Sequence, residues 1–277
     1  MQNYHSYHPY IARTPFFACQ ADPRFAYCLY VPPSYYADES EFTLLTIVHG
    51  SRRTAEGYRD AFADFADRER CIVLAPLFPV GIPAPGEQHS YKYLRHGTLR
   101  YDEVLHAMID ELRERFPRLR ERMLLHGYSG GGQFAHRYLY LHPERLAAVS
   151  VGAPGTVSLL DVNMDWWPGI RDFETTFGKR PDLAALRDVP VHLVVGEKDT
   201  ETWDVIVSHE SPTWAPGAND AGSTRRERLN ALKINLEKHG VAAELETVPG
   251  VAHDGMCVLE PVRAFFSRVL HGSAAWD

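Results

Sequence analysis

Apolar residues along the chain fall into short uninterrupted runs, separated by longer segments in which they recur every three or four positions. The short runs are rich in Val, Ile, Leu and Tyr, and most are bounded by Gly or Pro, which predicts β-strands. The predicted strands are Phe25–Val31, Phe42–Val48, Cys71–Ala75, Met123–His126, Ala147–Val151, Val191–Gly196 and Ala243–Val248.

The longer segments predict helices, because their apolar residues line one helical face. In Thr98–Phe116, for example, Val104, Leu105, Met108 and Leu112 recur at this spacing. The other predicted helices are Thr54–Arg68, Gly130–Leu141, Thr224–His239 and Val258–Leu270. Strands that alternate with helices imply right-handed crossovers and a largely parallel sheet covered on both faces. No linker divides the chain, so we predict a single α/β domain over residues 1–277.

Three long segments interrupt the alternation of strands and helices: Pro76–Arg100, Thr156–Arg187 and Glu201–Ser223. Long insertions in a compact domain are usually lids or binding loops. We expect residues 156–187 to form a cap or lid, although its aromatic side chains have a second interpretation, that they only anchor the loops to the body. Our candidate substrate-binding residues are Tyr128, Trp166, Trp167 and Trp203.

The composition is that of a soluble globular protein and excludes a disordered chain, with 45% hydrophobic and 23% charged residues among 277. A net charge of −7 argues against a nucleic-acid-binding protein. The chain has no apolar run long enough to span a membrane, no visible signal peptide, and no CxxC pair among its four cysteines. We therefore expect a cytoplasmic protein.

The strongest chemical signal is Gly127-Tyr128-Ser129-Gly130-Gly131, a G-x-S-x-G sequence between a predicted strand and a predicted helix. A sharp turn in that context strains the serine backbone and exposes its Oγ, which is the arrangement of a nucleophile elbow. The flanking glycines lack the Cβ atoms that would collide in so tight a turn. Ser129 is therefore our candidate nucleophile.

A serine hydroxyl needs a base to take its proton, and the base needs an acid to orient it. Open α/β sheets build their sites beyond the carboxyl ends of the strands. Asp199 follows the strand Val191–Gly196, and His253 follows the next strand, so Ser129, Asp199 and His253 occur in the expected order. Glu197 and Asp204 are the alternatives to Asp199 as the acidic member.

An oxyanion hole is expected from two backbone N–H groups, one after the nucleophile and one from the loop after Phe42–Val48. These are the N–H groups of Gly130 and, in the sequence His49-Gly50-Ser51, of Ser51. We favour a structural role for His49 beneath that loop over a catalytic one.

Taken together, strand–HGS, strand–GYSGG–helix, strand–GEKD and strand–PGVAHDG resemble the α/β-hydrolase superfamily over roughly residues 25–270. The segments Tyr27–Pro32 and Thr46–Gly50 resemble its polyhydroxybutyrate-depolymerase and feruloyl-esterase-like branch. The resemblance implies a mostly parallel sheet of about eight strands and a serine esterase with no metal and no organic cofactor. The chain departs from the branch in lacking a secretion signal and a polymer-binding module, so extracellular polymer degradation is not expected.

The residues favour hydrolysis of a carboxylic ester or lactone of a small apolar or aromatic molecule, through an acyl-enzyme on Ser129. A serine peptidase or amidase would use the same three residues, and an acyltransferase would replace water by another acceptor. A binding protein that has lost turnover is a further alternative, because one fold hosts many activities. We expect a small-molecule ester as the partner. The oligomeric state is not readable from the sequence.

Overall fold

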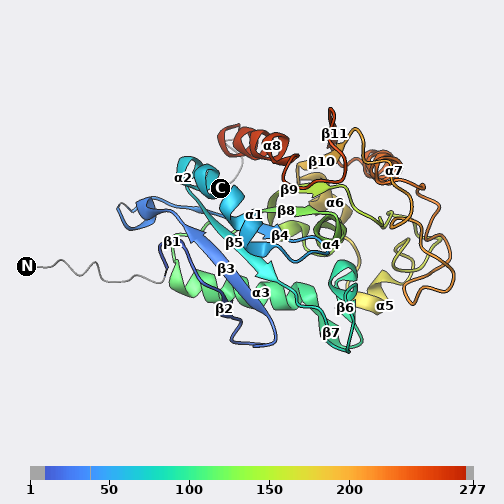
Figure 1. The fold of residues 1–277 in the computed structure, drawn as a ribbon, viewed down its shortest axis with the longest axis horizontal. Helices are drawn as coiled ribbons and strands as arrows, with labels where there is room; N and C mark the ends of the chain where they lie inside the picture. Colours follow the sequence, from blue (N-terminus) through green and yellow to red (C-terminus); the bar gives the residue numbers. More distant parts are fainter. Residues whose placement is uncertain (1–9, 38, 273–277) are drawn as a thin grey trace, which may run out of the picture.

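A nine-stranded sheet runs through the middle of the molecule, which a computed structural model describes over residues 10–37 and 39–272 (Figure 1). Residues 1–9 lie outside the described residues. They make up most of the segment for which the sequence analysis expects no signal peptide. The strands of the sheet are β1 (Ala12–Arg13), β2 (Phe17–Ala18), β3 (Ala26–Val31), β4 (Thr43–Val48), β5 (Cys71–Leu77), β8 (Met123–Tyr128), β9 (Leu146–Gly152), β10 (Val191–Gly196) and β11 (Ala243–Val248).

The sheet is mostly parallel, as the sequence predicts. Its order is β1-β3-β5-β4-β8-β9-β10-β11, with β2 paired to β3, and all neighbours from β5 to β11 are parallel. The antiparallel part is one edge, where β3 pairs with β5 and β1 and β2 pair with β3. The central strands β4 and β8 are buried along their whole length, as expected for a sheet covered on both faces.

The seven predicted strands are all present, two of them with the predicted bounds and the others within one or two residues at each end. The sequence patterns missed β1, β2 and a separate hairpin of β6 (Arg95–His96) and β7 (Leu99–Arg100). Each of these strands has only two residues, too few to show an alternating pattern.

The five predicted helices are also present, with two changes. The helix expected over 54–68 is interrupted at Phe62, whose backbone leaves the α-region at φ −100° and ψ 4° and whose buried ring packs on Phe65. The helix expected from Thr98 starts at Tyr101, because Leu99 and Arg100 pair with β6 instead. The helices are α1 (Ala55–Ala61), α2 (Ala63–Glu69), α3 (Tyr101–Arg115), α4 (Gly130–Leu141), α5 (Phe173–Phe177), α6 (Leu183–Arg187), α7 (Arg225–Lys238) and α8 (Leu259–His271), with 3₁₀ turns η1 (Pro33–Tyr36), η2 (Ser90–Tyr93) and η3 (Pro143–Arg145).

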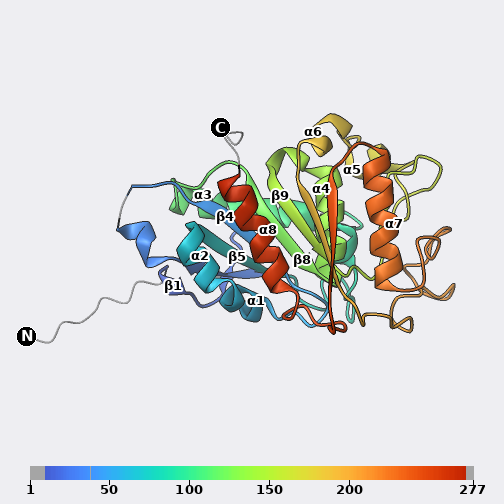
Figure 2. The same ribbon diagram turned by 90° about the horizontal axis from the view of Figure 1, so that it is seen from above.

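Helices cover both faces of the sheet. Helices α1, α2 and α8 lie on one face, and α3 and α4 lie on the other (Figure 2). Helix α7 packs on β10 and β11 at the end of the sheet. Because the strands from β5 to β11 are parallel, their carboxyl ends lie along one edge of the sheet. The predicted site residues follow β4, β8, β10 and β11 at that edge.

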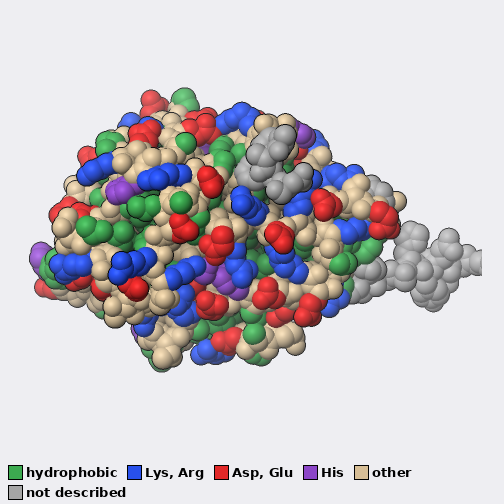
Figure 3. All heavy atoms as spheres, turned by 180° about the vertical axis from the view of Figure 1, so that it is seen from behind, with side chains coloured by type: hydrophobic (Ala, Val, Ile, Leu, Met, Phe, Trp, Pro, Cys, Tyr) green, Lys and Arg blue, Asp and Glu red, His purple; other side chains and the backbone are tan. Residues whose placement is uncertain are grey.

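The surface carries charges of both signs. On the face shown in Figure 3, Lys and Arg side chains are interspersed with Asp and Glu side chains rather than gathered into an area of one sign. Among residues 10–37 and 39–272, no helix has the length and apolar character needed to cross a membrane.

Candidate active site

Ser129 stands alone between a strand and a helix. Strand β8 ends at Tyr128, helix α4 begins at Gly130, and Ser129 itself has φ 57° and ψ −114°. Side-chain-bearing residues rarely adopt this left-handed region, and the strain is typical of functional positions. The backbone N–H of Ser129 donates to the Gly152 oxygen at 2.8 Å, which ties the turn to the neighbouring strand.

The elbow requires glycine on both sides of Ser129. A Cβ atom at Gly127 would lie 2.1 Å from the backbone oxygen of Gly131, and one at Gly131 would lie 2.0 Å from the backbone oxygen of Val48. Both obstacles are backbone atoms that cannot rotate away. The two glycines thus allow β8, α4 and the end of β4 to approach closely enough to form the turn.

The structure brings Ser129, His253 and Asp199 into one hydrogen-bonded row. His253 Nε2 lies 3.0 Å from Ser129 Oγ, and His253 Nδ1 lies 2.6 Å from Asp199 Oδ2. The side chain of His253 is 28% exposed, whereas Asp199 is fully buried. The serine and imidazole therefore face accessible space, and the carboxylate lies behind them.

Backbone contacts between two loops set the positions of Asp199 and His253. Strands β10 and β11 pair in parallel register, and beyond their ends the Lys198 N–H donates to the Val251 oxygen at 2.7 Å. The side chain of Glu197, one of the alternative acids, accepts the Gly250 N–H at 2.8 Å. Glu197 thus braces the loop that carries His253.

Arg225, which the sequence patterns missed, holds Asp199 from behind. Its guanidinium donates to Asp199 Oδ1 at 3.0 Å and to the carboxylate of Asp204, the other alternative acid. Burial alone would raise the pKa of Asp199, but the hydrogen bond and charge of His253 and those of Arg225 outweigh burial and lower that pKa. Asp199 therefore stays ionised at neutral pH.

A sequence signal for Arg225 does exist. Thr224 and Glu227 form a capping box at the start of α7, which puts Arg225 and Arg226 in its first turn. The helix dipole disfavours a cation in the first turn of a helix. An arginine at that position therefore predicts a carboxylate partner elsewhere in the fold.

We expect Arg225→Gln to lower kcat by up to about 10²-fold, because a displaced Asp199 would no longer hold the His253 imidazole in line with Ser129. Arg226→Gln is the matched control, because Arg226 lies in the same helical turn but donates to a backbone oxygen, that of Glu197. Arg225→Lys should recover part of the loss. Equal kcat values for the two glutamine variants would contradict the positioning role.

Two backbone N–H groups, those of Ser51 and Gly130, are the candidates for binding an oxyanion. In the part of the chain that the structure describes, the N–H groups of Ser51 and Gly130 donate to no protein acceptor. A Cβ atom at Gly50 would lie 3.5 Å from the Cβ of Ser129, so this loop passes directly beside the serine. The assignment of Ser51 and Gly130 to an oxyanion hole stays a prediction.

His49 has the hydrogen bonds of a structural residue. It is fully buried, its Nδ1 donates to the Gly50 oxygen at 2.8 Å, and its Nε2 accepts the Phe78 N–H at 3.0 Å. Burial lowers its pKa to about 4, so the ring is neutral. Both nitrogens are used in shaping the loop that carries Ser51, as expected.

The four candidate substrate-binding residues lie in different environments. Tyr128 is 3% exposed, and its ring packs on that of His253 with centroids 5.0 Å apart. Trp166 packs on Phe173, and the buried Trp167 donates to the Thr213 oxygen at 2.8 Å. Trp203, in contrast, is 78% exposed. Tyr128 thus contacts His253, the two neighbouring tryptophans pack within the insertions, and Trp203 lies on the surface.

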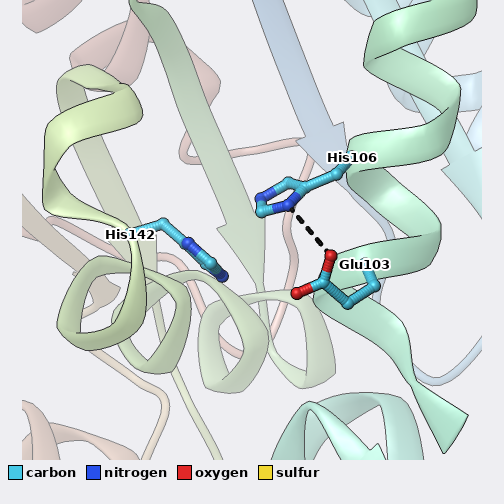
Figure 4. A group of neighbouring side chains, drawn as sticks. All are labelled: Glu103, His106 and His142. Atoms are coloured by element: carbon cyan, nitrogen blue, oxygen red, sulfur yellow. Dashed lines mark ion pairs between the residues drawn. The ribbon is translucent and has the colours of Figure 1, made fainter. Parts of the chain in front are cut away.

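A second cluster of titratable side chains lies at the other end of α4. Glu103, His106 and His142 bring possible metal ligands within 4.8 Å of one another (Figure 4). The His106 and His142 Nε2 atoms each have a partner, Tyr138 Oη and Asp102 Oδ2 respectively, both at 2.9 Å. Arg100 and Lys179 also lie in this cluster. Arg100 pairs with both Asp102 and Glu103, so the arrangement is that of a partly buried polar network between α3 and the end of α4.

No family model and no curated protein matches the chain. Solved structures are similar to it. Poly(aspartic acid) hydrolase-1 from Sphingomonas sp. KT-1 has a TM-score of 0.68 at 22% identity, over 87% of this chain and 92% of that one. A poly(3-hydroxybutyrate) depolymerase from Bordetella parapertussis gives 0.69 at 22% identity, over 87% and 83%. An S-formylglutathione hydrolase from Agrobacterium tumefaciens gives 0.60 at 15% identity, over 89% of each chain. With its mostly parallel sheet and helices on both faces, the chain therefore has the α/β-hydrolase fold.

Proposed function

We propose that the protein is a serine hydrolase that cleaves a carboxylic ester or lactone of a small molecule through an acyl-enzyme on Ser129. The observation that carries this proposal is the unbroken row from Asp199 through His253 to Ser129, with distances of 2.6 Å and 3.0 Å. A nucleophile, a base and an orienting acid within hydrogen-bond reach are the requirement for this chemistry.

In the proposed first half-reaction, Ser129 Oγ attacks the ester carbonyl and His253 Nε2 takes the proton of the hydroxyl. Asp199 keeps the Nδ1 proton in place and stabilises the imidazolium that forms. The N–H groups of Ser51 and Gly130 bind the oxyanion of the tetrahedral intermediate. His253 then returns the proton to the departing alcohol, which leaves the acyl group on Ser129.

In the second half-reaction, a water molecule loses its proton to His253 and attacks the acyl-enzyme carbonyl. The same N–H groups bind the second oxyanion. Its collapse breaks the bond to Ser129 Oγ, which takes the proton back from His253, and the acid is released.

The structural neighbours support hydrolysis in general and ester cleavage in particular. Those named above are hydrolases, and others are named a ferulic acid esterase and a siderophore hydrolase. At such identities the likeness itself extends to the fold, so the chemical step rests on the side chains of this chain.

The substrate side of the proposal rests on Tyr128, which contacts His253, and on the tryptophans of the insertions. We propose that Tyr128, Trp166, Trp167 and Trp203 wall the pocket for a small apolar or aromatic group, and that residues 156–187 form its cap within a single domain. Pockets of this kind are lined mainly by apolar and aromatic side chains with few polar groups.

Hydrolysis of a series of nitrophenyl esters of increasing acyl length tests the proposed function, together with labelling of the protein by a fluorophosphonate. We expect turnover with a clear optimum of acyl length, and about one label per chain by intact mass, because one serine is activated. Labelling without ester turnover would contradict ester hydrolysis and favour an amide substrate or another acyl acceptor. Absence of both signals would contradict a serine hydrolase altogether.

A further inference from the structure

A lysine lies against the residue that follows the proposed nucleophile. Lys92 belongs to η2, which packs on the start of α4. A Cβ atom at Gly130 would lie 3.1 Å from Lys92 Cε and 2.2 Å from Tyr91 Oη. The lysine stem therefore passes directly beside the backbone whose N–H is proposed to bind the oxyanion, and the absence of a side chain at Gly130 makes room for it.

The ammonium group of Lys92 is buried without a counter-ion. Lys92 is 6% exposed, and its Nζ donates to His89 Nδ1 at 2.9 Å. Within residues 10–37 and 39–272, no carboxylate forms an ion pair with it. Glu87, the nearest acid in sequence, instead accepts the N–H groups of His89 and Ser90. A buried charge is costly unless it is paired, so this arrangement requires a reason.

A comparison with Arg137 shows what a satisfied buried cation looks like in this protein. Arg137 is fully buried and also lacks a carboxylate, but its three nitrogens donate to Ser158 Oγ, Thr156 Oγ1 and the backbone oxygen of Lys92, at 2.7–3.0 Å. Lys92 has three N–H donors and uses one, on a neutral imidazole. Two of its N–H donors are thus left for a ligand.

We propose that Lys92 is a specificity residue that binds a carboxylate of the substrate, so that the preferred esters carry a second acid group on the acyl part. This inference rests on the proposed ester hydrolysis at Ser129. The acyl carbonyl oxygen would sit at the Gly130 N–H, and the proposal assigns the acyl chain, which adjoins that carbonyl, to the side on which Lys92 lies. An ionised carboxylate there would supply the missing counter-ion and accept the free donors.

The surroundings of Lys92 also give the subsite a pH dependence. Burial, followed by repulsion from Arg53 and Arg137, lowers the pKa of Lys92 to about 8, while Glu87 and Asp204 act in the opposite direction. Burial and the charge of Lys92 lower the pKa of His89 to about 4, so His89 stays neutral above pH 5 or so. Lys92 is a cation below about pH 8 and becomes neutral above it, so the preference for an anionic ester should be highest below that pH.

The test compares monoethyl succinate with ethyl butanoate, two esters of the same alcohol and acyl length, by titration of the acid released. In Lys92→Met, we expect the ratio of kcat/KM for the anionic ester to that for the neutral ester to fall about 10- to 100-fold, the usual worth of a charged hydrogen bond. Lys233→Met is the control on the outer part of α7, where Lys233 pairs with Glu237, and it should keep the wild-type ratio. A Lys92→Met variant that lost both activities equally, or neither, would overturn the proposal.

The pH profile of the wild-type protein gives an independent readout that does not depend on the folding of a variant. The same ratio should decline above about pH 8, since kcat/KM reports groups of the free enzyme. A ratio that stays flat between about pH 6 and about pH 10 would overturn the proposal. Fluorophosphonate labelling of each protein distinguishes failure of the Lys92 subsite from failure of the proposed function. If the proteins are labelled and cleave the neutral ester but the ratio does not change, the Lys92 subsite alone is refuted. If the wild type shows neither labelling nor ester turnover, the proposed function is refuted.

Discussion

Ser129→Ala is expected to lower ester turnover by about 10⁶-fold and to abolish fluorophosphonate labelling, because it removes the atom on which the proposed acyl-enzyme forms. The loss should be confined to kcat, as the remaining side chains still form the pocket. Removing Oγ also relieves nothing in the backbone, since φ 57° at this position is set by the surrounding glycines and by the bond to Gly152. We therefore expect the variant to fold.

The measurements are kcat for the best nitrophenyl ester, intact mass after labelling, and thermal unfolding. Ser208→Ala is a matched control, because Ser208 is exposed in the loop after β10, and it should retain turnover and labelling. If Ser129→Ala kept either wild-type turnover or the label, Ser129 would not be the nucleophile.

Asp199→Asn is expected to lower kcat by about 10⁴-fold, the size known for this exchange in a serine protease triad. An amide NH₂ facing His253 Nδ1 favours the tautomer that carries its proton on Nε2, so the imidazole can no longer take the proton of Ser129. The exchange also removes one of the two carboxylates that Arg225 bridges. Stability should fall too, because breaking a buried ion pair leaves a charge without its partner.

Glu197→Gln separates this role from a general effect of charge near the site. Glu197 accepts the Gly250 N–H, which a glutamine oxygen can still do, so kcat should stay within about tenfold of wild type. The two variants are compared by kcat and by the rate of fluorophosphonate labelling. A larger loss in Glu197→Gln than in Asp199→Asn would reassign the acidic residue.

Local sequence patterns predicted the helices and strands that adjoin the candidate site residues. Helix α4 and strands β10 and β11 have the bounds expected from the sequence, because a glycine or a proline stands at or next to an end of each: Gly130 begins α4, Gly196 ends β10 and Pro249 follows β11. The positions of Ser129, Asp199 and His253 relative to those ends followed directly, and the structure brings the three side chains together.

What the sequence patterns missed depends on contacts between distant segments. Arg225 lies 26 residues beyond Asp199 and reaches it only because α7 packs on the end of the sheet. Lys92 lies in an irregular insertion with no periodicity, and its place beside Gly130 follows from the packing of η2 on α4. The interruption at Phe62 is likewise decided by tertiary packing rather than by local preference.

The crowded glycines around Ser129 also determine which positions of the turn can accept a different side chain. Cβ atoms at Gly132 and Gly152 would lie 2.4 Å from the Gly152 oxygen and 2.5 Å from Tyr128 Cδ2, so methyl groups are excluded there as they are at Gly127 and Gly131. The side chain at 129, in contrast, faces accessible space. A thiol or another reactive group can therefore be introduced at position 129, whereas the glycines around it must be retained.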